Sequence, residues 1–334
     1  MTDRIAQATP VRVAHIRADE VSTVLTDDRL LAMIGFGETR PSVPDARLAW
    51  VPLAVPESAE QIFEAWFGST AAVSSLFEGV VATHNGEVLF GHLHLDDSAC
   101  GGIETATVTA YHRLLACARD AGYPHLLRVW HFFANIHAIC GDLDRYQAFC
   151  RGRFAALAES AAGCEMRLPA ASALGSHVPG LTVQFLACRG PGLQIENPRQ
   201  VSAFRYPERY APRSPSFSRS VLLPRADEAE LLLISGTASI VGHQSRHEDD
   251  PLAQLGETID NLDALLAAAA SARQRIARFA VLRAYLRIVE FAPFVREVIA
   301  ERLGADLPVI ILAADICRPE LHIEIEGLAY CVDA

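Results

Sequence analysis

The sequence lacks several features that would place it in a large class of proteins at once. It has no apolar run long enough to cross a bilayer, and the residues after Met1 do not resemble a secretory signal. Its eight cysteines are scattered without a CxxC pair, which is typical of reduced thiols and not of a disulfide framework. These absences predict a cytoplasmic protein that neither spans a membrane nor depends on disulfides.

Positive charge is scarce: 29 lysine and arginine residues stand against 40 aspartate and glutamate residues, a net charge of −11. Such a chain repels the phosphates of nucleic acids and of anionic lipids, so neither is expected as a partner. There is no HExxH sequence to accompany His92 and His94, and Gly35-Phe-Gly37 lacks the spacing of a dinucleotide-binding or phosphate-binding loop. We therefore expect no metal and no cofactor.

One stretch departs from this acidic background: residues 205–219, Arg-Tyr-Pro-Glu-Arg-Tyr-Ala-Pro-Arg-Ser-Pro-Ser-Phe-Ser-Arg. Its three prolines exclude a helix or a central strand, and they stiffen the backbone so that guanidinium and hydroxyl groups are held in place. Arginine suits two-pronged binding of carboxylate or phosphate, so the stretch predicts a site for a small anion. The alternative is a basic, solvated interdomain linker.

An order of strands and helices occurs twice along the chain. The first copy has a strand at 88–95, helix at 105–121, strand at 125–133, helix at 146–160 and strands at 181–187 and 193–197, with an extra loop at 164–179. The second has a strand at 231–241, helix at 253–270, strand at 278–288, helix at 291–303 and strands at 309–313 and 321–326. This repeat predicts an α+β fold with mixed sheets and helices on one face of each. A ligand is expected in the groove between the copies.

The residues before the first copy are expected to be mainly extended, with strands at 11–16, 30–35 and 48–55. Ser58, followed three residues later by Gln61, resembles a capping box and predicts a helix over 58–66. Asn85-Gly86 predicts a hairpin turn between strands at 80–82 and 88–95. We divide the chain into an N-terminal domain at 1–204, a connecting loop at 205–220 and a C-terminal domain at 221–334.

Two family resemblances follow from longer motifs. The second copy resembles the YjgF/RidA family at Ser235-Gly-Thr-Ala-Ser239, at residues 254–263, at Ala284-Tyr-Leu-Arg287 and at Ile323-Glu-Ile-Glu-Gly-Leu-Ala329. The whole chain resembles the chorismatases, which cleave chorismate, at Tyr210-Ala-Pro-Arg-Ser-Pro-Ser-Phe-Ser-Arg219, Gly236-Thr-Ala-Ser-Ile-Val-Gly-His243, Arg145-Tyr-Gln-Ala-Phe-Cys-Arg-Gly-Arg153, and Cys317 with Glu324. The resemblance implies two repeats like those of RidA and chorismate mutase proteins.

The resemblance also implies how a substrate is held. Chorismate carries two carboxylates, each of which requires its own cationic group. The candidates for that role are Arg153, Arg213, Arg219 and Arg287. The candidates for other substrate contacts are Tyr210, Ser216, Ser218, Ala238 and Tyr285. Taken one at a time, Arg153 and Arg287 fit surface salt bridges equally well.

Release of pyruvate from an enol ether requires a proton at the terminal methylene carbon. A carboxyl group in a partly apolar site has a raised pKa and suits this step. On the strand at 321–326, period two puts His322, Glu324 and Glu326 on one face. The resemblance points to Glu324 as the general acid. Without the resemblance, a solvent-facing strand glutamate would be the simpler interpretation.

Product choice in the family goes with two positions. A glycine that opens the Gly-Thr-Ala-Ser motif and a cysteine seven residues before the catalytic glutamate accompany 3-hydroxybenzoate formation, whereas alanine and valine accompany hydrolysis to a dihydroxycyclohexadiene carboxylate. Gly236 and Cys317 therefore imply a 3-hydroxybenzoate synthase. Hydrolysis is the alternative, and a RidA-type imine deaminase and a non-catalytic binder of small acids stay open. We expect a monomer, because the site lies between repeats of one chain.

Overall fold

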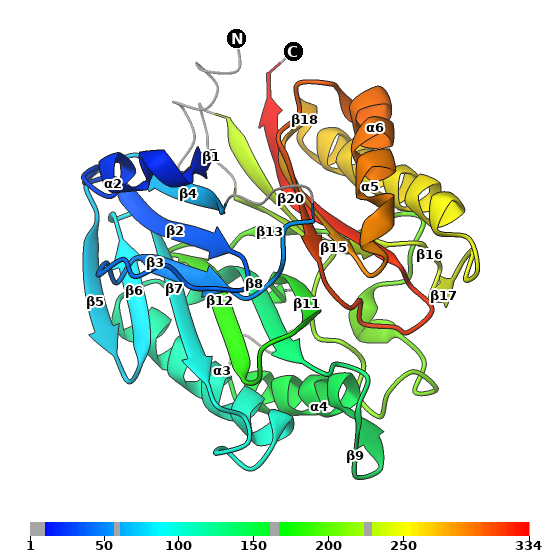
Figure 1. Ribbon diagram of the computed structural model, residues 1–334, viewed down its shortest axis with the longest axis horizontal. Coiled ribbons are helices and arrows are strands. Elements are labelled where there is room, and N and C mark those ends of the chain that lie inside the picture. Colours follow the sequence, from blue (N-terminus) through cyan, green and yellow to red (C-terminus); the bar gives the residue numbers. More distant parts are fainter. Residues whose placement is uncertain (1–10, 57–60, 161–166, 224–228, 334) are drawn as a thin grey trace.

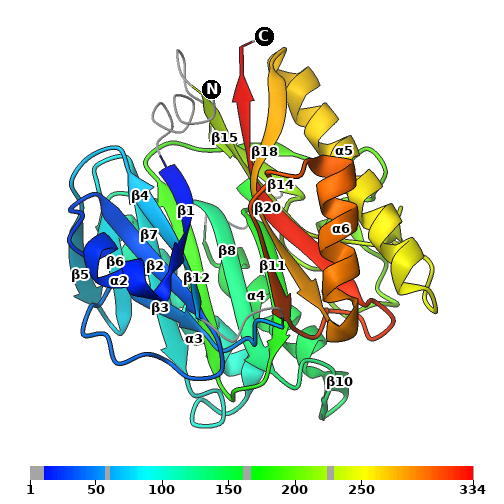
Figure 2. The same ribbon diagram turned by 45° about the horizontal axis from the view of Figure 1, so that its top comes forward.

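The computed structural model describes residues 11–56, 61–160, 167–223 and 229–333. Three sheets face one another across the centre of the molecule, and the long helices lie outside them (Figures 1 and 2). In the described residues, no helix has the length and apolar character needed to cross a membrane. The seven cysteines among them are all free thiols.

The N-terminal sheet has the strand order β1-β4-β2-β3. Its elements are β1 (Val11–Arg17), η1 (Ala18–Glu20), α2 (Val21–Val24), β2 (Leu30–Phe36), β3 (Leu48–Val51) and β4 (Ile62–Gly68). The helix expected at 58–66 is wrong from Ile62 onward, where β4 pairs with β1 on one side and β2 on the other. Ser58 lies outside the described residues, and the Gln61 amide donates to the Thr39 carbonyl (2.8 Å). Pairing on both sides, with Phe63 and Trp66 buried, overrides the local capping pattern.

The first repeat forms a six-stranded sheet of order β11-β8-β12-β7-β6-β5. Its strands are β5 (Val73–Phe77), β6 (Val80–His84), β7 (Val88–Leu95), β8 (His125–Ala134), β11 (Ala170–Ser176) and β12 (Leu181–Cys188), and its helices are α3 (Ile103–Asp120) and α4 (Arg145–Ala158). A small hairpin, β9 (Ile139–Cys140) with β10 (Leu143–Asp144), precedes α4. The hairpin predicted at Asn85-Gly86 is confirmed, because β6 and β7 pair antiparallel around it.

The second repeat forms a sheet of order β13-β14-β15-β20-β18-β19. Its strands are β13 (Leu193–Ile195), β14 (Ser220–Leu223), β15 (Glu230–Ala238), β18 (Ile276–Leu286), β19 (Val309–Ala313) and β20 (Ile323–Val332), and its helices are α5 (Pro251–Arg273) and α6 (Ala292–Leu303). Short elements complete it: η4 (Ala203–Arg205), β16 (Ile240–Val241), β17 (Gln244–Ser245) and η5 (Val289–Phe291). The repeated order of elements is thus confirmed in outline.

One detail of the predicted repeat is wrong. The strand that corresponds to β19 is β11, which lies inside the stretch expected to be an extra loop, and β12 corresponds to β20. Leu193–Ile195 instead joins the other sheet as β13, beside β14. The β11 sequence, Ala-Ala-Ser-Ala-Leu-Gly-Ser, has few of the branched and aromatic residues that mark a strand. The β11 segment forms a strand because it pairs with β8.

The N-terminal sheet has the same topology as the two repeats. In each of the three sheets an edge strand pairs parallel with its neighbour, as β3 does with β2, β11 with β8 and β19 with β18. The next two pairings are antiparallel in every case: β2-β4-β1, β8-β12-β7 and β18-β20-β15. The chain therefore contains a third, reduced copy of the repeat, without the two long helices.

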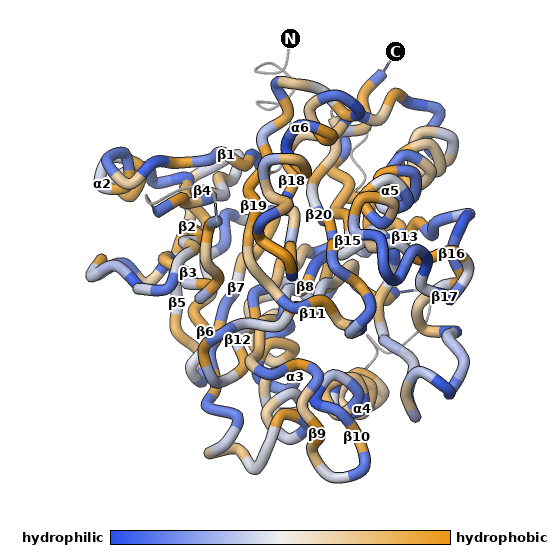
Figure 3. The backbone as a smooth tube through the Cα atoms, turned by 45° about the vertical axis from the view of Figure 1, so that its right-hand side comes forward, coloured by the Kyte–Doolittle hydropathy of each residue, from blue (hydrophilic) through white to orange (hydrophobic). Residues whose placement is uncertain are grey.

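The inner faces of the three sheets share one core. Trp66 from β4 meets Trp130 from β8 edge to face, with ring centroids 5.5 Å apart, and Leu312 from β19 belongs to the same cluster. Separate apolar clusters lie between each six-stranded sheet and its helices. Figure 3 shows the hydrophobic colours along β18 and β19 in the interior and hydrophilic colours on many outer loops. The repeats are therefore packed directly against one another.

Candidate active site

A cavity of about 250 Å³ lies between the two repeats and under the basic segment 205–219. The first repeat contributes Tyr146 and Arg153 from α4 and Ser172 from β11. The basic segment contributes Tyr206, Arg209, Tyr210, Phe217 and Arg219, and the second repeat contributes Gly236, Ala238, Cys317, Arg318 and Glu324. The expected groove between the copies is therefore present, and the basic segment forms one of its walls.

The helix that carries Arg153 is fixed at its start and is tied to the basic segment. Asp144 caps α4 by accepting from the Gln147 N–H (2.7 Å), and the Gln147 side chain accepts from the Asp144 N–H (3.1 Å). The Gln147 amide also donates to the Tyr210 carbonyl (2.9 Å). Gln147 thus connects the start of α4, on one side of the cavity, to the basic segment on the other.

Glu324 lies on β20 at the cavity wall, with only 4% of its surface exposed. It pairs across the sheet with Ala238 on β15. Burial raises the pKa of Glu324 to about 8, with a further contribution from the charge of Glu326 and opposition from Arg128 and Arg219. Within the described residues, no group donates a hydrogen bond to this carboxyl group. It therefore keeps its proton at neutral pH and is free to donate it.

Gly236 lies directly against the acid. A Cβ at this position would overlap Glu324 Oε1 and would lie 2.6 Å from Cδ and 3.0 Å from Ser172 Oγ. The backbone N–H of Gly236 donates to Ser172 Oγ (2.9 Å). The absence of a side chain is therefore what allows the Glu324 carboxyl group to rest on the β15 backbone.

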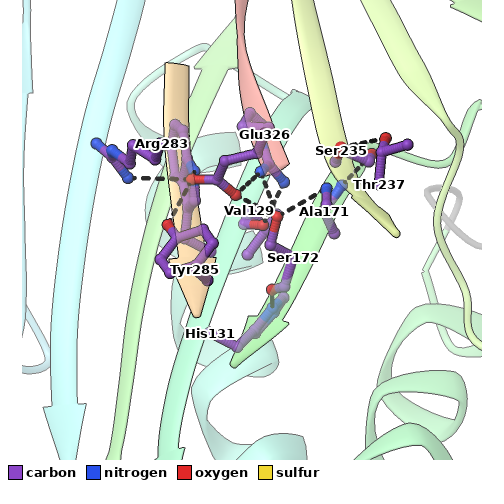
Figure 4. A network of polar contacts seen from close by, with 12 residues as sticks. Val129, His131, Ala171, Ser172, Ser235, Thr237, Arg283, Tyr285 and Glu326 are labelled. Atoms are coloured by element: carbon purple, nitrogen blue, oxygen red, sulfur yellow. Dashed lines mark hydrogen bonds and ion pairs between the residues drawn. The ribbon is translucent and has the colours of Figure 1, made fainter. Parts of the chain in front are cut away.

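A second carboxylate, Glu326, lies two residues further along β20 and is fully bonded (Figure 4). Its donors are Trp130 Nε1 (2.9 Å), Tyr285 OH (2.7 Å), Arg283 Nη1 (3.3 Å), Arg128 Nη2 and Ser172 Oγ. The hydroxyl hydrogen of Ser172 is thereby committed to Glu326, while its oxygen accepts from Gly236. Ser172 links the Glu326 side chain to the backbone on which Glu324 rests.

None of the four arginines that line the cavity has a carboxylate within salt-bridge distance among the described residues, and three of them, Arg153, Arg219 and Arg318, are at least partly buried. Arg153 is 2% exposed and stacks on Phe149, 5.0 Å from its centroid, and Arg219 is 3% exposed. Arg318 lies 4.0 Å from the centroid of Tyr210. Nε of Arg153, Nε of Arg219 and Nη2 of Arg318 have no hydrogen-bond partner in the described part of the chain. A buried cation without a counter-ion is costly, so Arg153 and Arg219, with the half-buried Arg318 beside them, indicate an anion-binding cavity.

The chain is similar to several known proteins. The family model "Chorismatase FkbO/Hyg5-like, N-terminal" matches residues 64–187. The chain is 33% identical to a 3-hydroxybenzoate synthase of Streptomyces hygroscopicus, over 82% of this chain and 83% of the relative. It is 33% identical to a chorismatase of Streptomyces rapamycinicus, over 96% and 98% of the two chains.

A crystal structure of a chorismatase superposes with a TM-score of 0.84 at 29% identity, covering 95% of this chain and 98% of the other. The chain belongs to the chorismatase family of enzymes. A member of the YjgF/YER057c/UK114 family from Mycobacterium tuberculosis also matches, over 39% of this chain with a TM-score of 0.27 and 23% identity.

In this chorismatase, five of the residues proposed for substrate contacts lie outside the cavity. Arg213 stacks on Phe154 (4.6 Å) and, with Ser216, lines a separate depression. Ser218 is fully buried and donates to the Leu168 carbonyl (3.0 Å). The other two are Tyr285, which donates to Glu326, and Arg287.

Arg287 shapes the loop that carries two cavity residues. Its guanidinium donates to the carbonyls of Ile316 (3.2 Å), Arg318 (3.1 Å) and Pro319, and it pairs with Asp315 (3.2 Å). The loop places Cys317 at the cavity wall. Burial, followed by the nearby Glu324, raises the pKa of the Cys317 thiol to about 12, so the sulfur stays protonated and offers a weak donor.

Two residues at the cavity, Arg318 and Ser172, were not predicted from the sequence. Arg318 directly follows the cysteine of the family motif, which was the available signal. Its contact with Tyr210 joins the loop after β19 to the basic segment, and no local pattern encodes such a contact. Ser172 had no signal, because the strand that carries it was expected to be a loop. No group of three metal-ligating side chains occurs in the residues that the structure describes.

Proposed function

We propose that the protein cleaves chorismate to 3-hydroxybenzoate and pyruvate, with Glu324 as the general acid. The observation that carries the proposal is a buried carboxyl group with a pKa of about 8 in a cavity lined by four arginines that have no carboxylate partner in the described residues. The names of the relatives, a 3-hydroxybenzoate synthase and chorismatases, agree with this chemistry.

The charge of the cavity matches a dianion. Its lining contains four arginines and, besides the protonated Glu324, two carboxylates, Asp144 and Glu320. Asp144 caps α4, and Glu320 accepts from Ser245 Oγ (2.6 Å). The remaining two positive charges correspond to the two carboxylates of chorismate. In our proposal Arg153, Arg219 and Arg318 hold these carboxylates, because guanidinium groups bind them in two-pronged geometry.

Glu324 then transfers its proton to the terminal methylene carbon of the enolpyruvyl group. The ether bond at ring carbon C3 breaks and pyruvate leaves with the ether oxygen. The C4 hydroxyl oxygen bonds to C3, and its proton restores the Glu324 carboxyl group. The resulting epoxide isomerises to the phenol. No water is consumed, so the atoms of chorismate equal those of 3-hydroxybenzoate and pyruvate together.

Gly236 and Cys317 support the water-free route over the hydrolytic one. A glycine at 236 lets the acid lie against β15, whereas an alanine would push the carboxyl group into the cavity. The Cys317 thiol is a weak donor at the cavity wall, where it is available to steer the opening of the epoxide. Hydrolysis to the dihydroxycyclohexadiene carboxylate and pyruvate is the second candidate, because only Gly236 and Cys317 distinguish the water-free route from it.

The test is incubation of the purified full chain with chorismate, without added metal or cofactor, and separation of products by chromatography and mass. Pyruvate with 3-hydroxybenzoate is the expected outcome. Pyruvate with the hydrated diene acid would keep the role of Glu324 and refute the product assignment. No pyruvate would favour the deaminase or a non-catalytic binder. A single chain supplies every named wall of the cavity, so we also propose a monomer, which sedimentation would check.

A further inference from the structure

A second cavity, of about 290 Å³, lies between the N-terminal sheet and the first repeat. It shares no lining residue with the proposed active site. The polar and aromatic side chains in its lining that could contact a ligand include Arg40, Trp50, His92, His94, Thr182 and Gln184. Because its volume is close to that of the first cavity, a ligand of similar size fits.

Gln184 is the unusual group in this cavity. Its side chain is fully buried on β12, and neither the oxygen nor the nitrogen of its amide has a hydrogen-bond partner among the described residues. A buried amide with both ends unbonded costs free energy, and proteins normally satisfy such groups with protein, water or ligand. The amide therefore requires an occupant that both donates and accepts.

The two cavities are built from equivalent strands. The active-site cavity combines the first and last strands of the second repeat, β15 and β20, with the edge strand β11 of the first repeat. The second cavity combines the first and last strands of the first repeat, β7 and β12, with the edge strand β3 of the N-terminal sheet. Each cavity thus lies at the same seam between one copy and the copy before it.

The sheet register makes the comparison specific to single residues. In each sheet the pairing between the second and the last strand of the copy has one register shift: Arg128 pairs with Leu186, Val281 with Leu328 and Ala32 with Trp66, and each pair lies directly beside the shift. The shift marks the same place in all three sheets, so Leu186, Leu328 and Trp66 correspond to one another.

Two residues before Leu186, Leu328 and Trp66 stand Gln184, Glu326 and Glu64. The two carboxylates accept hydrogen bonds from arginine and tryptophan side chains, whereas the Gln184 amide has no partner in the described residues. Gln184 therefore holds the position of the central carboxylates, and Thr182 holds the position of the proposed acid Glu324. Thr182 has no carboxyl proton to transfer to carbon, so the second cavity can bind a ligand but cannot carry out the same reaction.

The cation of the second cavity also has a counterpart. Arg40 lies in the connection between β2 and β3, as Arg153 lies in the connection between β8 and β11. Its charge acts on both His92 and His94, whose pKa values are lowered mainly by burial, so the imidazoles are neutral. Glu38 is the other charged lining residue. With one arginine and one carboxylate here, against four arginines and two carboxylates in the first cavity, the site offers a cation for at most one carboxylate.

A flat apolar wall completes the second cavity. The indole of Trp50 lies against Gly35, where a Cβ would be 2.6 Å from its Cζ3 atom, so the ring is held in one orientation. His92 Nε2 donates to the Ala46 carbonyl (3.0 Å), and His94 Nδ1 bonds with Thr182 Oγ1 (3.0 Å). These bonds fix both imidazoles beside the amide.

We infer that this cavity is a second, non-catalytic binding site for a small hydroxylated ring monocarboxylate. Arg40 binds the carboxylate, Trp50 covers the ring, and Gln184 exchanges hydrogen bonds with a ring hydroxyl. The inference stands on the equivalence of the sheets and on Gln184, and it does not require the proposed function.

The test is calorimetric titration of the full chain with 3-hydroxybenzoate as the probe. To isolate the second cavity, we would use the Arg153→Met variant, which weakens the first. One saturable event with a dissociation constant of about 1 mM or tighter is expected. It should weaken about tenfold or more when Arg40→Ala or Gln184→Leu is added, because each removes a direct contact. Arg119→Ala, an exposed arginine on α3, is the matched control and should leave it unchanged.

Arg40 is exposed, so Arg40→Ala is expected to leave the fold intact even if Gln184→Leu destabilises the protein. Glu38→Gln should tighten binding, since it removes the negative charge nearest to the bound anion. The inference would be overturned if the Arg153→Met variant showed no saturable binding of the probe. It would also be overturned if Arg40→Ala, Gln184→Leu and Glu38→Gln all left the binding unchanged. A crystal soaked with the probe in which water alone occupies the cavity would likewise overturn it. Chorismate turnover is measured separately, so failure of the proposed function would not imitate any of these results.

Discussion

The contact between Gly236 and Glu324 gives the sharpest prediction. In Gly236→Ala the new Cβ would be 2.6 Å from Glu324 Cδ, whereas an ordinary carbon contact is about 3.5–4.0 Å. The carboxyl group must therefore move by about 1 Å, and it can do so because it is the end of a flexible side chain. A misplacement of about 1 Å at a reacting group costs about 100-fold in rate. We expect 3-hydroxybenzoate formation to fall by that order, with the hydrated diene acid as the main remaining product.

The assay is product analysis after reaction with chorismate, together with thermal unfolding. Gly256→Ala on α5 is the matched control, because a Cβ there meets nothing within 4 Å. That control should leave the product ratio unchanged and stabilise the helix by about 0.5–1 kcal/mol. An unchanged rate of 3-hydroxybenzoate formation in Gly236→Ala, in a protein that melts like the wild type, would refute the idea that this contact positions the acid.

Three further predictions concern the proton and the charges. Glu324→Gln should lose turnover by orders of magnitude with substrate binding largely kept, because size is retained and the proton is not; near-normal turnover would rule out the acid role. The value of kcat/KM should be flat at neutral pH and fall above about pH 8, where Glu324 ionises. In Glu326→Gln this fall should move to lower pH, because the negative charge that helps to raise the pKa of Glu324 is gone. A pH profile that is the same in both proteins would contradict the assignment of Glu324 as the acid. Arg153→Met should raise both KM and the melting temperature, since it removes a substrate contact and a buried charge without a carboxylate partner; a less stable protein with unchanged KM would show a structural role instead.

The sequence by itself determined the features that depend on local patterns. The helices α3 to α6 were located from the order of elements along the sequence, and caps such as Asp250, which accepts from two N–H groups at the start of α5, define where they begin. The hairpin at Asn85-Gly86 follows from turn chemistry. The basic segment 205–219 was located by composition, and seven of the twelve proposed site residues line the cavity beside it.

Only the tertiary structure decided the features that depend on distant partners. Strand β4 and strand β11 exist because neighbouring strands accept their hydrogen bonds, and their own sequences predict a helix and a loop. The third copy of the repeat has no long helices to mark it, so only its strand pairing reveals it.

The same holds for the chemistry of the site. A sequence shows a glutamate, but the pKa of Glu324 is raised mainly by its burial, which arises when the two repeats pack together, and then by Glu326 on the same strand. Likewise, nothing local distinguishes Arg153, which has no carboxylate partner in the described residues, from Arg287, which binds backbone carbonyls and Asp315. The sequence named the residue types that the chemistry needs, and packing between repeats decided which of them face the cavity, because desolvation and charge pairing are properties of three-dimensional surroundings.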